Sequence, residues 1–310
     1  TRRSSDLSTT NLLFANFSQK LGRIITGRNC SLLDNGLQRR HFGIEIEACD
    51  YASGDGYVDY DTAEDAIFCL FDKFDREDGL YEVKDDCSLV GNHFEFVTSP
   101  MTMSLLKGLN WPDFFYALLA NGYKQTDFNN YDRAGIHVHV NRKSLNHPFE
   151  AAVNALTFIT ENEDTIRRFA RRSRNQWDDW CQTPYELYNH LDRFVGEIAD
   201  GNYTSFGWEY NSPVQVDETR YRAVNFCSDR TWELRIFNST LDAQDMYNIL
   251  DFAEALWDLA DTDHYDMSIE SMHDKLIELG NPVAASQMYK PPIDTRISDD
   301  YDYCDCDDDW

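Results

Sequence analysis

Four short segments of this chain place charged or metal-binding residues at every second position inside an apolar run. They are FGIEIE at 42–47, HFEF at 93–96, GIHVH at 135–139 and WELRIF at 232–237. A period of two puts alternate side chains on one face of a β-strand. One face of each strand is therefore apolar, and the other carries carboxylates, imidazoles or an arginine. Because a face of that kind does not build a hydrophobic core, we expect these strands to line a concave polar site.

The length and composition predict one large domain with two added segments. The chain has 310 residues, of which 42% are hydrophobic and 14% aromatic, so it can bury a sizeable core. We expect a polar, basic N-terminal arm at 1–40, a single domain at 41–290 and an acidic C-terminal tail at 291–310. Strands and helices do not alternate regularly in the domain, which favours an α+β fold with an antiparallel sheet over a doubly wound parallel sheet.

The charge balance excludes several classes of partner. Lys and Arg number 28 against 55 Asp and Glu, and the net charge of −27 argues against direct binding to nucleic acid or to an anionic membrane. The sequence contains no run of about 18 apolar residues and no apolar signal core, so neither a membrane span nor secretion is expected. The eight cysteines form no Cys-x-x-Cys pair and are predicted to be mostly buried free thiols. We therefore expect a reducing, cytoplasmic setting.

The spacing of apolar residues predicts the order of the elements. Strands are expected at 41–49, 80–84, 92–98, 134–141, 219–227 and 231–237, and helices at 62–75, 102–121, 147–174, 185–198, 242–260 and 267–279. The second and third strands are expected to form a hairpin, as are the last two, which a Ser228-Asp229 turn joins. Thr62 is the expected N-cap of its helix, Asn121-Gly122 is an expected C-terminal stop, and 201–216 is expected to be a loop.

Carboxylates are the first group of candidate ligands. Glu45 and Glu47 share a strand face and lie about 7 Å apart, so they repel each other unless a cation lies between them. Glu95, between two phenylalanines, repeats the pattern on a second strand, and Asp86 follows the strand before it. Mg²⁺ bound with substrate phosphates uses only a few such carboxylates. The alternatives are an exposed edge strand for the Glu pair and an ordinary turn around Asp86.

His137 and His139 form the most conspicuous pair. A single histidine in a strand is usually a satisfied core residue, whereas two at period two after Ala-Gly indicate ligands. Zinc is the natural rival, but it would need a third nitrogen or sulfur ligand. Because the candidate partners here are carboxylates, the donor set favours Mg²⁺ or Mn²⁺.

Arginines supply candidate anion-binding groups. Glu233 and Arg235 share a strand face, where a plain salt bridge is the alternative reading, and Arg222 is expected on the preceding strand. The planar guanidinium suits phosphate and carboxylate. A separate arginine cluster at 167–174 either pairs with local acids on a solvated helix or captures an anionic substrate or nucleotide phosphate. Its members are Arg167, Arg168, Arg171, Arg172 and Arg174.

Taken together and in this order, the motifs resemble the glutamine-synthetase-like carboxylate–amine ligase superfamily, in particular its amidoligase branch of bacteria and phages. The pattern of that branch is Gly-x-Glu-x-Glu, Asp-x-Ser, a Glu-bearing strand ending near Ser-Pro, His-x-His, an Arg strand and Glu-x-Arg. This sequence supplies, in order, Gly43-Ile-Glu-Ile-Glu47, Asp86-Cys-Ser88, Phe94-Glu-Phe-Val-Thr-Ser-Pro100, Gly135-Ile-His-Val-His139, Arg222 and Glu233-Leu-Arg235. The resemblance covers about residues 41–260 and leaves out the arm and the tail. Asp86 departs from the Glu of the larger glutamine synthetases, and a dedicated ammonia site has no convincing counterpart.

The resemblance implies a curved antiparallel sheet that carries ATP and metals on its concave face and helices on its convex face. The residues implied to hold two Mg²⁺ (or Mn²⁺) ions are Glu45, His137 and Glu233 for the first and Glu47, Asp86 and Glu95 for the second. Those implied to bind the nucleotide are His139, Arg222 and Arg235, the two arginines as catalytic groups that stabilise the phosphoryl group in transfer.

The activity implied is ATP- and Mg²⁺-dependent ligation of a carboxylate to an amine through an acyl phosphate, which forms an amide or isopeptide bond. The substrates would be a peptide, a cell-wall fragment, an amino acid or a protein side chain, and a glutamate–cysteine-ligase-like activity is the nearest enzymatic alternative. A second hypothesis is a non-catalytic structural or assembly protein, for example of a phage particle, that binds a protein partner through the arm or the tail. A third is a single-zinc hydrolase built on His137 and His139.

Overall fold

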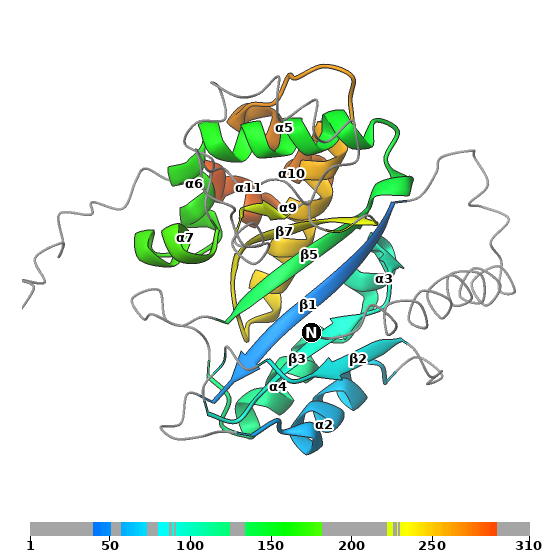
Figure 1. The fold of residues 1–310 in the computed structure, drawn as a ribbon, viewed down its shortest axis with the longest axis vertical. Coiled ribbons are helices and arrows are strands. Elements are labelled where there is room, and N and C mark those ends of the chain that lie inside the picture. Colours follow the sequence, from blue (N-terminus) through cyan, green and yellow to red (C-terminus); the bar gives the residue numbers. More distant parts are fainter. Residues whose placement is uncertain are drawn as a thin grey trace, which may run out of the picture.

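The computed structural model describes residues 40–50, 57–72, 80–86, 89, 91–124, 134–181, 222–225, 228 and 230–289. These residues form an open, seven-stranded antiparallel sheet and a set of helices, which confirms the mixed helix-and-strand class (Figure 1). The helix expected at 185–198, the loop at 201–216, the arm before residue 40 and the acidic tail all lie outside the described residues.

The sheet is built around β1, which pairs with β3 on one side and with β5 on the other. The strand order is β2-β3-β1-β5-β7-β6, and β4 pairs with β1 off this path. The two hairpins expected from the sequence are both present as antiparallel pairs, β2 with β3 and β6 with β7. The strands are β1 (His41–Cys49), β2 (Tyr81–Lys84), β3 (His93–Thr98), β4 (Met101–Thr102), β5 (Gly135–Asn141), β6 (Val224–Asn225) and β7 (Thr231–Asn238).

The predicted alternation of apolar and polar side chains is confirmed on β1. Phe42, Ile44 and Ile46 are at most 2% exposed and belong to the hydrophobic core, whereas the intervening Glu45 is only partly buried. The same apolar face continues onto neighbouring strands, where Phe96 of β3 contributes to the core. One face of the sheet therefore holds the core, and the other is left to polar side chains.

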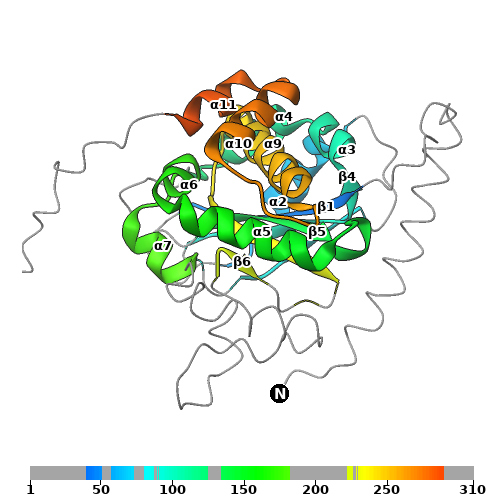
Figure 2. The ribbon, with the colours of Figure 1, turned by 90° about the horizontal axis from the view of Figure 1, so that it is seen from above.

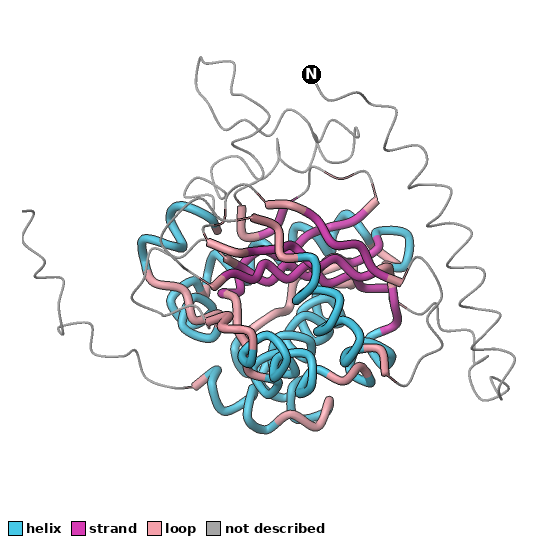
Figure 3. Tube along the Cα trace, turned by 90° about the horizontal axis from the view of Figure 1, so that it is seen from below, coloured by secondary structure: helices cyan, strands magenta, loops and turns pink. Residues whose placement is uncertain are grey.

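Helices cover the apolar face. The long helix α9 packs against β5 and against the helices α3, α4 and α5. Figure 2 shows α9, α10 and α11 on the same side of the sheet, and in Figure 3 most of the helices gather on one side of the strands. None of the described helices is long and apolar enough to cross a membrane. The helices are α2 (Tyr60–Leu70), α3 (Met103–Gly108), α4 (Trp111–Ala120), α5 (Pro148–Glu161), α6 (Glu163–Phe169), α7 (Arg174–Trp180), α9 (Ala243–Ala260), α10 (Ile269–Glu278) and α11 (Pro282–Met288), with a short 3₁₀ turn at Arg142–Ser144.

Aromatic side chains join the sheet to these helices. The ring of Phe96 lies 5.5 Å from that of Phe114 on α4, measured between centroids. Phe237 of β7 meets Phe252 of α9 edge to face at 5.8 Å. Aromatic pairs of this kind stabilise the fold by more than the apolar area that they bury. They fix β3 and β7 against the helices.

Several helix boundaries differ from the expected ones. Thr62 was the wrong N-cap: α2 begins earlier, and the side chain of Asp59 accepts the hydrogen bond from Thr62 N at 3.1 Å. The expected helix at 102–121 is two helices, because α3 ends at Gly108 and a new helix begins just before Pro112, a residue favoured at helix starts. The helical stretch at 147–174 is likewise divided into α5 and α6, and α7 begins at its end.

Candidate functional site

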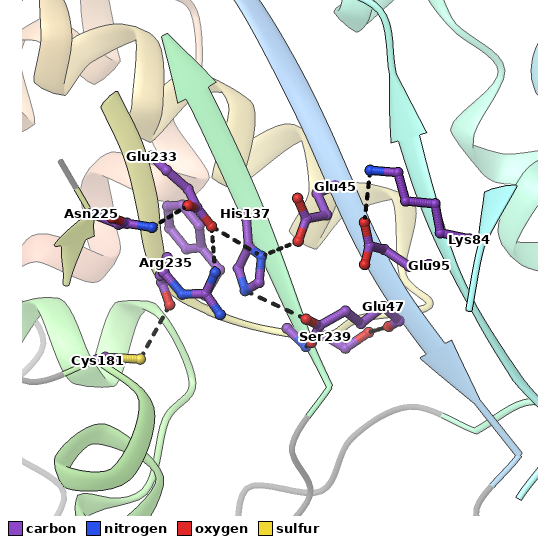
Figure 4. Close-up of polar contacts among 12 residues, drawn as sticks. Glu45, Glu47, Lys84, Glu95, His137, Cys181, Asn225, Glu233, Arg235 and Ser239 are labelled. Carbon is purple, nitrogen blue, oxygen red and sulfur yellow. Dashed lines mark hydrogen bonds and ion pairs between the residues drawn. The ribbon is translucent and has the colours of Figure 1, made fainter. Parts of the chain in front are cut away.

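Residues from four strands meet on the polar face of the sheet. Glu45 of β1 is the register partner of His137 on β5 and Glu47 is that of Glu95 on β3. His139 of β5 is in turn paired with Glu233 on β7. Because directly opposed residues of neighbouring strands point to the same face, the alternation within each strand brings all of these side chains together (Figure 4).

A bulge in β7 adjusts this arrangement. Val138 of β5 pairs with Leu234, whereas Ile136 pairs with Phe237. Between these two pairs β5 has one residue and β7 has two. A bulge of this kind re-aims side chains. Here Leu234 and Phe237 both lie in the core, and Arg235 lies on the polar face beside His137.

Three of these residues form a candidate metal centre. His137 Nδ1 lies 2.7 Å from Glu45 Oε1 and 3.4 Å from Glu233 Oε1. One ligand atom from each of the three residues lies within 4.8 Å of the others. His137 is 2% exposed and Glu233 is 8% exposed, so the group is enclosed. Two carboxylates and one imidazole fit a divalent cation, and the oxygen-rich set suits Mg²⁺ or Mn²⁺.

His139 borders this centre on a more open side. Its Nε2 lies 3.3 Å from the second oxygen of Glu45, and 23% of its side chain is exposed. Glu45 therefore contacts both histidines of the His-Val-His segment through different oxygens. Burial would lower the pKa of His139, but its hydrogen bond to the Glu45 carboxylate and the charge of Glu233 raise it.

The residues expected to hold a second ion are on the same face. Glu47 Oε1 lies 3.8 Å from His137 Nε2, and Glu47 Oε2 accepts a hydrogen bond of 2.6 Å from Gly135 N. Glu95 faces Lys84, whose Nζ lies 3.5 Å from Glu95 Oε1, and Asp86 is half-buried just after β2. Among the described residues, Glu47, Asp86 and Glu95 do not close into a second compact ligand group. Their role as ligands stays a prediction.

The electrostatics of the face show an excess of negative charge. Burial, together with the charges of Glu45 and Asp86, raises the pKa of Glu47 well above its usual value. Burial and the charge of Glu45 also raise the pKa of Glu95, to about 7, in spite of Lys84. A bound cation would relieve this repulsion.

At the candidate metal centre, by contrast, the pKa values of the carboxylates are lowered. Burial would raise the pKa of Glu45, but the charge of His137 and its hydrogen bond hold that pKa well below its usual value. Burial is likewise outweighed at Glu233, whose pKa the charge of Arg235 lowers. These two groups are thus kept in the ionised form that a metal ligand needs.

Of the two expected arginines, Arg235 lies on this face beside His137. Arg235 Nη1 donates to Glu233 Oε1 at 2.5 Å, and its side chain is 10% exposed. Arg222 is half-buried and comes directly before Ala223, whose carbonyl accepts a hydrogen bond of 3.0 Å from Arg235 N. The two arginines therefore belong to adjacent backbone segments, as the expected hairpin required.

Two contributors were missed in the sequence. Asn225 on β6 donates to Glu233 Oε2 at 2.7 Å and holds the oxygen that points away from His137. A signal was present in the expected strands at 219–227 and 231–237, because pairing their ends, 227 with 231, also places 225 opposite 233, as observed. Lys84 was missed for a different reason: it is paired with Glu95, and the long connection between β2 and β3 left that register open.

Residues 117–257 match the family model described as "putative amidoligase enzyme". The matched range begins in α4 and ends in α9, and it includes β5 and β7 with the His-x-His and Glu-x-Arg segments. β1 and β3, which carry Glu45, Glu47 and Glu95, precede it. No curated protein matches the chain in sequence.

Proposed function

On the premise that this chain belongs with the amidoligases, which the match over residues 117–257 supports, we propose that it is an ATP- and Mg²⁺-dependent carboxylate–amine ligase. The observation that carries the proposal is the group of Glu45, His137 and Glu233, which converges from three strands with Arg235 beside it. The product would be an amide or isopeptide bond, and the substrates a carboxylate and an amine of a peptide, an amino acid or a protein side chain.

The architecture is consistent with a glutamine-synthetase-like fold, which we propose for residues 41–290. Support comes from the open antiparallel sheet, whose apolar face is covered by helices and whose other face carries the acids and histidines. In this proposal, the segments 1–40 and 291–310 are accessory to the catalytic domain.

We propose that Glu45, His137 and Glu233 hold one Mg²⁺ ion and that Glu47, Asp86 and Glu95 hold a second. Burial and, after it, the charge of Glu45 raise the pKa of Glu47 and of Glu95, which supports a cation between them. When bound, the metal ions would neutralise the phosphate oxygens of ATP and so make the γ-phosphorus accessible to an anionic nucleophile.

The reaction that fits these groups has two steps. An oxygen of the substrate carboxylate attacks the γ-phosphorus of ATP, an O–P bond forms, the bond to the β-phosphate oxygen breaks, and ADP leaves. The amine then attacks the carbonyl carbon of the acyl phosphate, a C–N bond forms, the C–O bond breaks, and inorganic phosphate leaves while the amine loses a proton. The first step depends on positioning and charge neutralisation rather than on covalent help from the protein.

The side chains of this chain would share that work. Arg235 keeps its positive charge in the enclosed site, because Glu233 and Glu47 raise its pKa against the effect of burial. Together with Arg222 it would stabilise the charge on the phosphoryl group in transfer. His139, on the more open side, would contact a nucleotide phosphate or the metal. Asn225 would keep the Glu233 carboxylate turned toward His137.

Calorimetry with ATP and Mg²⁺ tests the proposal. The wild type should bind the nucleotide only with the metal, and Glu45→Gln and Glu233→Gln should each lose that binding. Glu278→Gln is the matched control, because this acid lies on α10 with 69% of its side chain exposed and should leave binding unchanged. ADP release in a screen of carboxylate and amine pairs would then identify the substrates.

Two results would contradict the ligase assignment. Tight binding of zinc without nucleotide, lost in a His139→Gln variant, would favour a hydrolase built on the two histidines. A folded wild type that binds neither nucleotide nor metal would leave the non-catalytic interpretation.

A further inference from the structure

The arginines of the 167–174 cluster do not share one role. Arg171 forms an ion pair with Asp245, and Arg174 forms ion pairs with Glu163 and with Asp178. Arg167 lies 3.5 Å from Asp164, and Arg168 donates to the Thr165 hydroxyl. These four follow the expected pattern of arginines on a solvated helix that pair with nearby groups. The fifth, Arg172, does not.

Arg172 is turned into the protein. It is 1% exposed, and its Nη2 donates to the carbonyl of Phe237 at 2.8 Å. Its Nε and Nη1 have no hydrogen-bond partner, and it forms no ion pair with any residue that the structure describes. A guanidinium is always charged and carries five N–H donors, and leaving such a group buried and unpaired is costly. Two donor groups of a buried cation therefore point toward no protein acceptor and suit an anionic ligand.

The guanidinium lies at the end of the polar face. A Cβ atom added to Gly135 would come within 2.6 Å of Arg172 Nη2 and within 3.2 Å of His137 Nε2. Arg172 and His137 therefore approach the same point, next to the backbone N–H that binds Glu47. Glycine at 135 leaves room for the arginine, since any larger residue would collide with it.

The backbone around Arg172 is anchored so that its side chain stays there. Arg171 has a φ of 60°, in the left-handed region that non-glycine residues rarely adopt, and this turn follows the end of α6. Asn238 at the end of β7 holds the turn: its N–H donates to Ala170 O at 3.0 Å and its side chain to Arg171 O at 3.1 Å. The last residues of β7 thus tie the turn to the sheet.

We propose that Arg172 is an anion-binding residue of this site, whose free Nε and Nη1 bind a substrate oxyanion, either a carboxylate or a phosphoryl group, beside His137. The proposal rests on the ligase function and deepens it, because the substrate carboxylate, ATP and the acyl phosphate all present such oxygens. Arg172 would supply a fixed positive charge at the opposite side of His137 from Glu45. A planar guanidinium can bind two oxygens of one anion at once.

Titration of the 310-residue chain with inorganic phosphate and, separately, with acetate tests the proposal without nucleotide. Binding is measured by calorimetry with and without Mg²⁺, at constant ionic strength. We expect the wild type to bind at least one of the two anions and Arg172→Met to weaken that binding by at least about tenfold. Arg174→Met removes the same charge from an exposed side chain and should bind as the wild type does. Gly135→Ala keeps the arginine but crowds Nη2, and should also weaken binding.

The outcomes separate the sources of the anion. Binding of phosphate alone would assign Arg172 to a phosphoryl group, binding of acetate alone to the substrate carboxylate, and binding of both to an oxyanion site that either group can occupy. If Arg172→Met does not fold by circular dichroism, Arg172→Lys decides, because it keeps the positive charge but loses the planar pair of donors and should also bind the anion more weakly. The proposal is overturned if neither anion binds to the wild type under either condition, or if these variants bind like the wild type. Because no nucleotide is used, this result is independent of the ATP experiment on Glu45 and Glu233.

Discussion

Glu45 and His137 lie 92 residues apart in the chain, yet Glu45 Oε1 is 2.7 Å from His137 Nδ1 across adjacent strands. Glu233 Oε1 approaches the same nitrogen from the other side at 3.4 Å. One imidazole nitrogen is therefore shared by carboxylates from the two strands that flank β5. The group exists only in the assembled sheet, so metal binding at this position should require the native fold.

The hydrogen bond from Asn225 to Glu233 predicts an indirect effect on metal binding. Asn225→Leu should weaken Mn²⁺ binding by about 10- to 100-fold, because residues that orient a metal ligand contribute on that scale. Paramagnetic titration of Mn²⁺ measures the change. Asn121→Ala, at the exposed end of α4, is the control and should leave the affinity unchanged. Equal affinities of Asn225→Leu and the wild type would mean that Asn225 does not orient a ligand.

The two faces of β1 should respond differently to substitution. Ile44 is 0% exposed, and Ile44→Ala should lower the free energy of unfolding by about 2–5 kcal/mol, since it leaves a cavity in the core. Glu45→Gln, one residue away on the polar face, keeps the size of the side chain and leaves no cavity, so it should cost less than Ile44→Ala in the metal-free protein. Urea unfolding in the presence of a chelator compares them. Similar losses in both variants would contradict the division of roles between the faces.

Asp261 predicts a pH-dependent contribution to stability away from the site. Its carboxylate accepts hydrogen bonds from the backbone N–H groups of Asn146 and His147, at 3.0 and 2.7 Å, and pairs with Arg40 at 2.8 Å. Burial would raise the pKa of Asp261, but these bonds lower it below the usual value. The pKa of an Asp in the unfolded chain is about 3.9. Above that pH the ionised Asp261 makes its full contribution to stability, and this contribution is lost as the pH falls through the lower pKa of the folded state.

Asp261→Asn should therefore destabilise the protein by about 1–3 kcal/mol at neutral pH. The difference from the wild type should stay constant down to pH of about 5 and shrink below about 4. Urea unfolding across this range measures it, with Asp164→Asn, an exposed acid of α6, as the control. A difference that grows as the pH falls would show the opposite sign and refute the assignment.

The ion pairs of Lys107 should contribute to the stability of the fold and not to ligand binding. Its ammonium pairs with Asp251 and, at 2.5 Å, with Glu254, both on α9. Lys107→Met leaves Asp251, which is 7% exposed, without its cation and should cost about 2 kcal/mol of stability. Lys143→Met, an exposed lysine, should cost less than about 0.5 kcal/mol. Thermal unfolding measures both, and Mg²⁺-dependent ATP binding should be the same in both variants, because neither lysine faces the site.

The sequence alone determined which residues share a face of each strand and restricted the register of the last hairpin. Period two is a property of the local backbone, so the pairing of Glu45 with Glu47 and of His137 with His139 on one face needed no knowledge of the fold. The expected strands at 219–227 and 231–237 are close together in the chain, which restricts their register, and Asn225 lies opposite Glu233.

Only the tertiary structure decided how the strands meet. The register of Glu45 against His137 joins segments far apart in the chain, and no local pattern specifies it, because it depends on which strands pair in the folded sheet. The bulge opposite His137 and the inward turn of Arg172 also depend on such long-range contacts. The five arginines at 167–174 looked alike in sequence, and Arg172 is distinguished because the turn at Arg171, held by the end of β7, directs its side chain inward. Local periodicity selects the face of a strand, whereas burial and hydrogen bonding between distant segments select its neighbours.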